Sequence, residues 1–427
     1  MRIDRIRIRG YKSIRDVSFS PHALSVLIGP NNAGKSNILD AISFISDLYG
    51  KSSKISIDRK GGFENIANRD NGRPVNEISF DITASGSLSE MAHRRYRDED
   101  KQDRIIINHS FTLRGRGQKL IADFFIASES LTVSLEMSNT NPPFIATRQN
   151  GEVRARWGKN EEERKLIASY FPTDEIKFLT RMIESSSSRE ELITESTKRF
   201  IPAIEKYVGY LSKIRIYQLA PNECRKNASP TPFADLEIHG ANLPALVYHL
   251  KESSPKQWSN VMEKMFHIFP ALERIEVEPT HDRLWSLRFK ERLGNQEWNT
   301  NEVSDGTIRA LAMLATIYDD RSSLLSIEEP ENALHPWITR TIIDACLSVT
   351  RKSKDRQILL TTHSPIVIEH LDPHDIMVVW KQSNETRLSS LSALDSEAIG
   401  LWKQGDLSLF DLLDSGHLIE AVPGLRS

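Results

Sequence analysis

An eight-residue loop near the start of the chain constrains its fold more than any other feature. The residues Gly29-Pro30-Asn31-Asn32-Ala33-Gly34-Lys35-Ser36 fit the pattern G-x-x-x-x-G-K-[ST]. The apolar run Leu24 to Ile28 precedes the loop, and apolar residues recur at helical spacing from Ile38 to Leu48 after it. We therefore expect a buried strand, a tight glycine turn and a helix in direct succession.

This succession predicts a phosphate-binding site. Backbone N–H groups in such a loop face inward, and the partial positive charge at the start of the helix favours an anion. Lys35 is expected to reach the β- and γ-phosphates of ATP, and the Ser36 hydroxyl is expected to hold Mg²⁺. Asn37 follows directly and completes the predicted ATP-binding segment. The alternative is a glycine-rich turn that binds nothing.

Composition excludes several classes of protein. The chain has 427 residues, enough for two or three lobes, and a net charge of -2. A dedicated nucleic-acid coat would be basic, so any DNA contact is expected to be local or to belong to a partner. The two cysteines, Cys224 and Cys346, support neither a disulfide framework nor a zinc site. Without an apolar run of about 18 residues or a signal peptide, we expect a cytoplasmic protein with no membrane partner.

Changes of pattern along the chain suggest four segments. Residues 1–150 contain the phosphate loop and, from Glu77 onward, short alternating runs that predict an antiparallel β subdomain. Residues 151–210 are charged and favour helix, so we expect a helical insertion. Residues 211–385 form a second α/β stretch, and residues 386–427 form a short amphipathic tail, which we expect to be helical.

Two acidic residues end an apolar run in the second α/β stretch. The run Leu324 to Ile327 is followed by Glu328 and Glu329, whose side chains point to opposite faces if the strand continues. One carboxylate can then coordinate Mg²⁺ while the other orients or deprotonates the attacking water. We assign Glu328 to the metal and Glu329 to the water. A solvated acidic loop after a core strand is the alternative.

Four motifs, taken in order, resemble those of an ABC ATPase. They are GPNNAGKS from Gly29, SDGT from Ser304, EEPENALHP from Glu328 and TTHSP from Thr361. The sequences of these motifs resemble those of AAA-family ATPases related to RecF, SMC proteins and the OLD nucleases. The resemblance covers most of residues 1–385. It implies an α/β P-loop NTPase fold of the ABC-head type, with an antiparallel β subdomain and a helical insertion.

The resemblance also implies roles for individual residues. Ser304, Asp305 and Gly306 correspond to the signature motif, which binds the γ-phosphate held by the other subunit of a dimer. Ser304 or Asp305 can cap a helix that begins at Thr307. Asn332 corresponds to the D-loop residue at the dimer seam, and His363 to the switch histidine that contacts the γ-phosphate. An ordinary capped loop and a satisfied histidine at a strand end are the respective alternatives.

The chain departs from the transporter pattern in two places. Transporter ATPases carry an aspartate-glutamate pair where this chain has Glu328-Glu329, and their Leu-Ser-Gly-Gly-Gln signature is absent. No glutamine lies between Gly61 and Arg73, where a Q-loop would fall, so a second protein ligand for Mg²⁺ stays unassigned. Two interpretations are open for Lys12, Ser13 and the arginines of the first predicted strand. They contact the nucleotide or DNA, or they belong to a solvated strand face.

These features predict an ATP-hydrolysing enzyme that uses ATP and Mg²⁺ and forms an ATP-dependent homodimer or higher oligomer. We expect its nucleotide state to control DNA or a separate effector, a nuclease or toxin, in bacterial anti-phage defence. The alternatives are a DNA repair ATPase, a sensor that holds a toxin with little turnover and, less favoured, a transporter subunit. A fused nuclease is disfavoured because about 60 residues follow His363, fewer than a typical domain needs.

Overall fold

A computed structural model describes most of the chain. The described residues are 1–70, 72–87, 104–116, 123–135, 144–158, 180–185, 188–198, 201–231, 235–292, 296–353, 355–394, 400 and 402. Most of the predicted C-terminal tail lies outside them. Among the described residues, no helix combines the length and the apolar character needed to cross a membrane.

The chain divides into two compact units, each discontinuous in sequence. The first comprises 1–21, 31–214 and 379–388, and the second comprises 22–30, 215–378 and 389–427. Each unit therefore contains residues that are far apart in the chain. The predicted boundaries at 150, 210 and 385 stay predictions.

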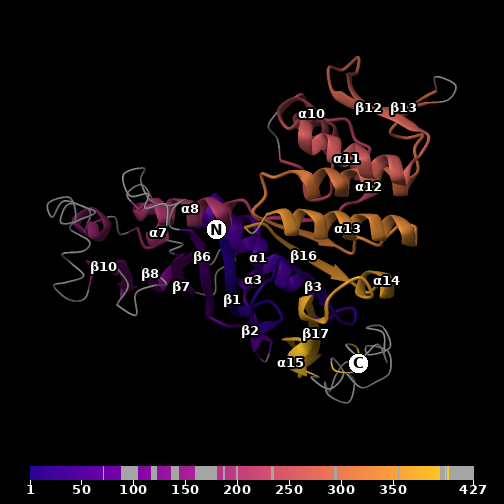
Figure 1. Cartoon of the computed structure of the whole chain (residues 1–427). Helices are drawn as coiled ribbons and strands as arrows, with labels where there is room; N and C mark the ends of the chain where they lie inside the picture. Colours follow the sequence, from indigo (N-terminus) through magenta and orange to yellow (C-terminus); the bar gives the residue numbers. More distant parts are fainter. Residues whose placement is uncertain are drawn as a thin grey trace. The chain divides into compact units, whose positions relative to one another are not determined.

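The first unit contains a seven-stranded antiparallel sheet with the strand order β10-β9-β8-β7-β6-β1-β2 (Figure 1). Alternate residues of β6 are buried, the period-two pattern of a sheet with one covered face. The predicted antiparallel β subdomain is confirmed. The strands are β1 (Arg2–Tyr11), β2 (Ile14–Phe19), β6 (Glu77–Ser87), β7 (Arg104–Arg116), β8 (Asp123–Leu135), β9 (Phe144–Gln149) and β10 (Glu152–Trp157).

Aromatic side chains join the helix that follows the phosphate loop to this sheet. Phe44 of the helix packs against Tyr11 and Phe80, with ring centroids 5.8 and 6.0 Å away, and Phe80 lies 5.4 Å from Phe111. All four rings are almost fully buried, so the helix is held by a large apolar contact. The helices and the hairpin of this unit are α1 (Lys35–Gly50), α2 (Ser53–Arg59), α3 (Phe63–Ile66), β4 (Arg69–Asp70), β5 (Arg73–Pro74), α7 (Ile193–Thr197) and α8 (Pro202–Ser212).

Two of the predicted segments differ from the structure. Residues 152–157 were expected to be helical but form β10, because Val153, Ala155 and Trp157 alternate with exposed residues and pair with β9. Helices α7 and α8 confirm helical structure in the later part of this segment, and residues 159–179 lie outside the described part. The expected helical tail begins instead inside β18 (Glu385–Ser390), followed by the short helix α15 (Leu391–Leu394).

The second unit is built on a parallel sheet. The strands β11, β15, β16, β3 and β17 lie in this order with parallel pairing, and β18 follows β17 at the edge. Every residue of β3 is buried, as expected for a strand covered on both faces. The strands are β3 (Leu24–Ile28), β11 (Arg215–Tyr217), β15 (Leu324–Glu328), β16 (Gln357–Thr362) and β17 (Ile376–Gln382), the last of which runs on into the first unit.

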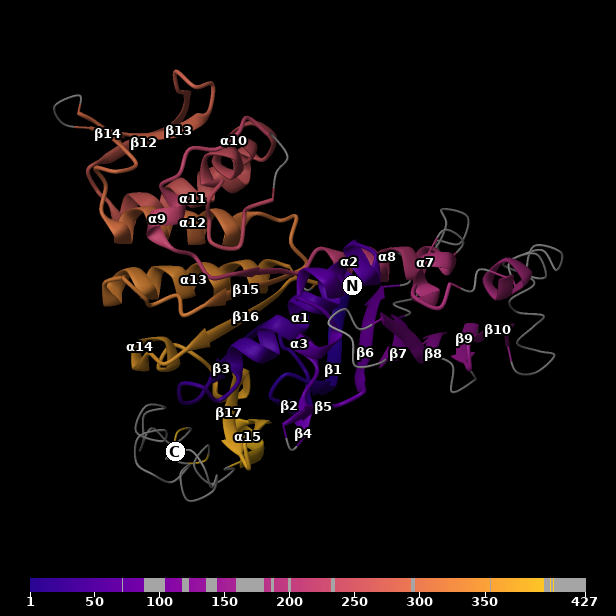
Figure 2. The same ribbon diagram turned by 180° about the vertical axis from the view of Figure 1, so that it is seen from behind.

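Helices and a small second sheet complete this unit. Figure 2 shows α10 and α11 beside the antiparallel strands β12, β13 and β14, a small sheet that the sequence did not predict. The elements are α9 (Pro221–Cys224), α10 (Leu243–Ser253), α11 (Pro255–Ile268), β12 (Leu272–Pro279), β13 (Trp285–Glu291), β14 (Glu297–Asn299), α12 (Asp305–Tyr318), α13 (Pro336–Lys352) and α14 (Pro365–Ile368).

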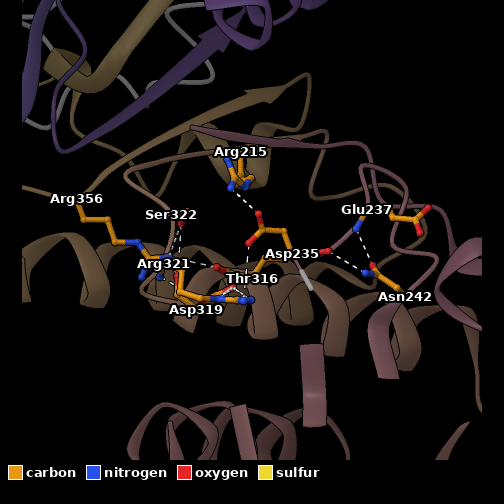
Figure 3. A network of polar contacts seen from close by, with 9 residues as sticks. All are labelled: Arg215, Asp235, Glu237, Asn242, Thr316, Asp319, Arg321, Ser322 and Arg356. Atoms are coloured by element: carbon orange, nitrogen blue, oxygen red, sulfur yellow. Dashed lines mark hydrogen bonds and ion pairs between the residues drawn. The ribbon is translucent and has the colours of Figure 1, made fainter. Parts of the chain in front are cut away.

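A polar network fixes the amino-terminal ends of the parallel strands (Figure 3). Arg356, directly before β16, is buried and donates 2.6 Å to the carbonyl oxygen of Asp319 at the end of α12. The Asp319 carboxylate pairs with Arg321 at 2.7 Å, and Asp235 pairs with Arg215, the first residue of β11, at 2.5 Å. The sheet is thereby held at one end, while Glu328 and His363 lie at the other, where β15 and β16 end.

Candidate functional site

The phosphate loop has the predicted strand, turn and helix. The strand β3 ends at Ile28, and α1 begins at Lys35, whose side chain is largely buried. Asn32 and Gly34 have φ angles of +64° and +109°, the left-handed conformation that turns the backbone tightly. Because the first N–H groups of a helix have no partner within the helix, this geometry suits a bound phosphate.

Side chains from distant parts of the first unit support this loop. Thr386 is completely buried, and its Oγ1 donates 3.1 Å to the carbonyl oxygen of Ala33. The same atom lies 2.7 Å from Ser13 Oγ, which accepts a 2.6 Å hydrogen bond from Asn37 Nδ2. These bonds hold the inside of the loop against β18 and the β1–β2 turn. Thr386 was not predicted as part of the site, because it lies in the predicted tail.

A polar cavity of about 250 Å³ adjoins the loop within the first unit. Lys12, Arg69 and Lys381 line it, and Lys381 Nζ donates 3.3 Å to Asn32 Oδ1 of the loop. Lys12 Nζ lies 2.6 Å from an oxygen of Asp40, a residue of α1. The three cations give this cavity a positive lining, which suits an anionic or acceptor-rich ligand. Lys12 and Ser13 thus line a cavity rather than a plain strand face.

The register of the parallel strands brings several predicted site residues to one edge of the second unit. Glu328 pairs with Thr361, and Thr362 pairs with Ile28, so β3, β15 and β16 end at the same level. The loop from Gly29, the pair Glu328-Glu329 and the residue His363 therefore all leave the sheet at its carboxyl edge. This is the position at which open parallel sheets bind ligands.

Glu329 is the centre of a contact group at this edge. Its φ of +45° is left-handed, and its N–H donates 3.0 Å to the carbonyl oxygen of Thr361. Its carboxylate accepts a hydrogen bond from Asn332 Nδ2 and lies 3.9 Å from His363 Nε2. The structure therefore brings together three predicted site residues. About a third of each side chain of the Glu329–His363 pair is exposed to solvent.

A buried arginine fixes the backbone of this group from the signature helix. Arg309 of α12 is 5% exposed, and its Nη2 donates 2.9 Å to the carbonyl oxygen of Glu329. Burial lowers the pKa of its guanidinium, while the nearby carboxylates Glu331 and Glu329 act in the opposite direction. The sequence analysis did not single out Arg309, which occupied a position within an apolar helix pattern.

The signature segment has the predicted cap. Ser304 Oγ accepts a 3.1 Å hydrogen bond from the N–H of Thr307, although the helix begins at Asp305, two residues earlier than predicted. Asp305 pairs with Arg225 at 2.6 Å. A Cβ added to Gly306 would lie 3.5 Å from the carbonyl oxygen of Ala333, so the predicted signature lies against the turn that carries the predicted D-loop residue Asn332. Ser304 and Asp305 are exposed, and the start of a 14-residue helix faces solvent there.

The strand pairing also identifies a glutamine that the sequence search did not find. Tyr217 at the end of β11 pairs with Ile327, so the next residues along the two strands are Gln218 and Glu328. Gln218 is exposed at the carboxyl edge of the sheet. The segment from Gly61 to Arg73, where a Q-loop glutamine was expected, forms α3 and the β4–β5 hairpin in the first unit.

The donor atoms available for a metal fit Mg²⁺. Gln218 and Glu328 follow paired residues of β11 and β15 and offer amide and carboxylate oxygens, hard ligands of the kind that Mg²⁺ prefers. Within the described ranges, no group of three or more His, Cys, Asp and Glu side chains gathers to hold a metal. A Mg²⁺ ion held by one or two protein oxygens would complete its shell with phosphate oxygens and water.

Comparisons with known proteins place the chain in a family. A family model described as "AAA domain, putative AbiEii toxin, Type IV TA system" matches residues 24–369. The chain is 23% identical over 380 residues to an ATP/GTP phosphatase of Helicobacter pylori (strain ATCC 700392 / 26695), and the match covers 87% of each chain.

Two solved structures are also similar. The SMC head domain from Thermotoga maritima is 13% identical, with a TM-score of 0.39, over 91% of this chain and 99% of that one. The Smc head domain from Pyrococcus furiosus, bound to the C-terminal domain of ScpA, is 13% identical with a TM-score of 0.46, over 95% and 100%. The family match spans most of the chain and all four motifs, so the chain belongs to this AAA-domain family and is an ATPase.

Proposed function

We propose that this protein hydrolyses ATP in a site shared by two copies of the chain. The observation that carries the proposal is the start of α12, which is exposed and capped by Ser304. The same chain also brings Glu329 and His363 together. A helix start with free N–H groups is a binding site for an anion. Because a signature of this kind serves the nucleotide of a facing copy, closure of the dimer would complete each site.

Within this site the residues have distinct roles. Lys35 and the loop N–H groups bind the β- and γ-phosphates, and Glu329 takes the proton of the attacking water. His363, 3.9 Å from Glu329, contacts the γ-phosphate, and Asn332 orients the Glu329 carboxylate. Mg²⁺ would neutralise charge on the phosphates when bound by Ser36 and Glu328, with Gln218 as the further oxygen ligand.

The cavity beside the loop supplies the nucleoside end of the site in this proposal. Lys381 bridges the cavity and the loop through its hydrogen bond to Asn32. The cavity volume of about 250 Å³ can hold a base or a ribose. Lys12 and Arg69 then offer donors to the ring nitrogens and hydroxyls of the nucleoside.

We further propose that the closed, ATP-bound dimer controls a separate effector, a nuclease or toxin, in bacterial anti-phage defence. The description of the matched family, which names a toxin and a toxin–antitoxin system, supports this setting. The net charge of -2 makes a partner protein a better candidate for the main contact than a long stretch of DNA.

A pull-down from native cells with tagged Glu329→Gln tests this role. The variant should keep ATP and hold the dimer closed, because the loop is intact and proton transfer is blocked. We expect mass spectrometry to find a nuclease or toxin that is enriched with Glu329→Gln and absent with Lys35→Ala. Enrichment of chromosomal repair proteins, or of DNA alone, would contradict the defence role and favour a repair ATPase.

A further inference from the structure

Glu331 follows the proposed catalytic glutamate by two residues, and none of the roles above uses it. Its Oε1 accepts a 2.7 Å hydrogen bond from Thr362 Oγ1 and a 3.0 Å hydrogen bond from the N–H of His363. The carboxylate thus links the loop after β15 to the loop after β16. These are the two loops that carry Glu329 and His363.

The link fixes the whole turn on which His363 lies. Thr362 is completely buried, and its Oγ1 also accepts a 2.9 Å hydrogen bond from the N–H of Ser364. One carboxylate oxygen therefore holds the turn at Thr362 directly and at Ser364 through the threonine hydroxyl. On the other side, Glu331 is part of its own tight turn, because its carbonyl oxygen accepts a hydrogen bond from the N–H of Leu334.

The second oxygen of this carboxylate has an unusual environment. Glu331 Oε2 is buried and accepts no hydrogen bond from any residue that the structure describes. Burying an oxygen that accepts no hydrogen bond costs free energy, and the nearby guanidinium of Arg309 offsets part of this cost. A glutamine could place its NH₂ group at this position and keep Oε1 as an acceptor.

We propose that Glu331 is a positioning residue that holds the His363 turn at the distance from Glu329 that ATP hydrolysis requires. The proposal rests on the function proposed above and assigns a role to a residue outside the predicted site. It concerns the chemical step, since the hydrogen bonds that the Glu331 carboxylate accepts come from Thr362 and His363. Displacement of a catalytic group by about 1 Å can cost on the order of 100-fold in rate.

Steady-state ATP turnover of Glu331→Ala and Glu331→Gln tests this role. We expect Glu331→Ala to lower kcat about 10- to 100-fold with little change in KM, because the turn moves while the phosphate loop stays intact. Glu331→Gln should recover most of the loss, because its amide oxygen still accepts both hydrogen bonds. Equal losses for both variants, or a parallel rise in KM, would overturn the proposal.

A double-mutant cycle with His363→Ala separates positioning from general structural support. If Glu331 acts through His363, Glu331→Ala should change kcat by less than about twofold in the His363→Ala background. If the two losses multiply, or if His363→Ala alone has no effect, Glu331 does not act through this histidine. Wild type and Glu329→Gln are assayed as controls. Absence of wild-type turnover would contradict the proposed function, whereas normal turnover of Glu331→Ala would contradict only this inference.

A second pair of variants covers the case in which the Glu331 variants fail to fold. Thr362→Val removes the hydroxyl that Glu331 binds and keeps the shape of the side chain, whereas Thr362→Ser keeps the hydroxyl. The valine variant should lower kcat several-fold, and the serine variant should stay close to wild type. Wild-type turnover in Thr362→Val would contradict the proposed link.

Discussion

Glu329→Gln should lower kcat for ATP hydrolysis by about 100- to 10,000-fold, the range typical of a lost general base. The amide keeps the size of the side chain but cannot accept the proton of water. The substitution changes neither the phosphate loop nor Lys35, and the Glu329 carbonyl oxygen still accepts the hydrogen bond from Arg309. The affinity for ATP should therefore stay within a few-fold of wild type. Turnover by a coupled phosphate assay and equilibrium binding of a fluorescent ATP analogue measure the two quantities.

A matched control for this variant is Glu273→Gln. Glu273 lies on β12 with an exposed side chain, so loss of its charge should leave kcat unchanged. If Glu329→Gln retains turnover within twofold of the control, another group activates the water and the assignment of Glu329 is wrong.

Gly34→Ala should remove most ATP binding, because the loop has no space for a side chain at this position. An added Cβ would lie 2.0 Å from Thr386 Oγ1 and 2.8 Å from Thr386 Cγ2, and the φ of +109° is strained for alanine. The buried, β-branched Thr386 side chain has little freedom to move. Backbone strain and overpacking of about 1–3 kcal/mol each predict a loss of affinity on the order of 100-fold, measured by isothermal titration calorimetry.

Gly209→Ala is the matched control for the loop variant. Gly209 lies in α8, and an added Cβ there meets no atom within 4 Å. Alanine also favours helix over glycine, so this variant should bind ATP normally and be at least as stable as wild type. Normal ATP binding by Gly34→Ala would show that the contact with Thr386 does not constrain the loop.

Local patterns were enough to predict the main features of the candidate site. The strand, loop and helix around Gly34, the acidic pair after β15 and the cap at Ser304 each depend on residues close together in sequence. Glycine conformation, apolar periodicity and capping are local effects, so they can be predicted from the spacing of residues in the sequence. The antiparallel sheet was predicted for the same reason, because each strand shows its own period of two.

The residues that were missed depend on pairing between distant segments. Thr386 meets Ser13 across 373 residues, and no local pattern marks this threonine. Gln218 follows a strand of only three residues, and only its register with β15 places it beside Glu328. The strand β10 was mistaken for helix because its charged residues suggested a solvated helix, whereas their partners lie on β9.

The central claim, that each site is completed by a second copy, is tested most directly by mixing two inactive variants. The Lys35→Ala variant does not bind phosphate. The Ser304→Arg variant loses the helix cap, and its arginine covers the start of α12. In an equal mixture that exchanges subunits, half of the dimers are mixed, and each contains one intact site. We predict a turnover of about a quarter of the wild-type rate from two variants that are each nearly inactive. A mixture as inactive as its components would contradict a shared site.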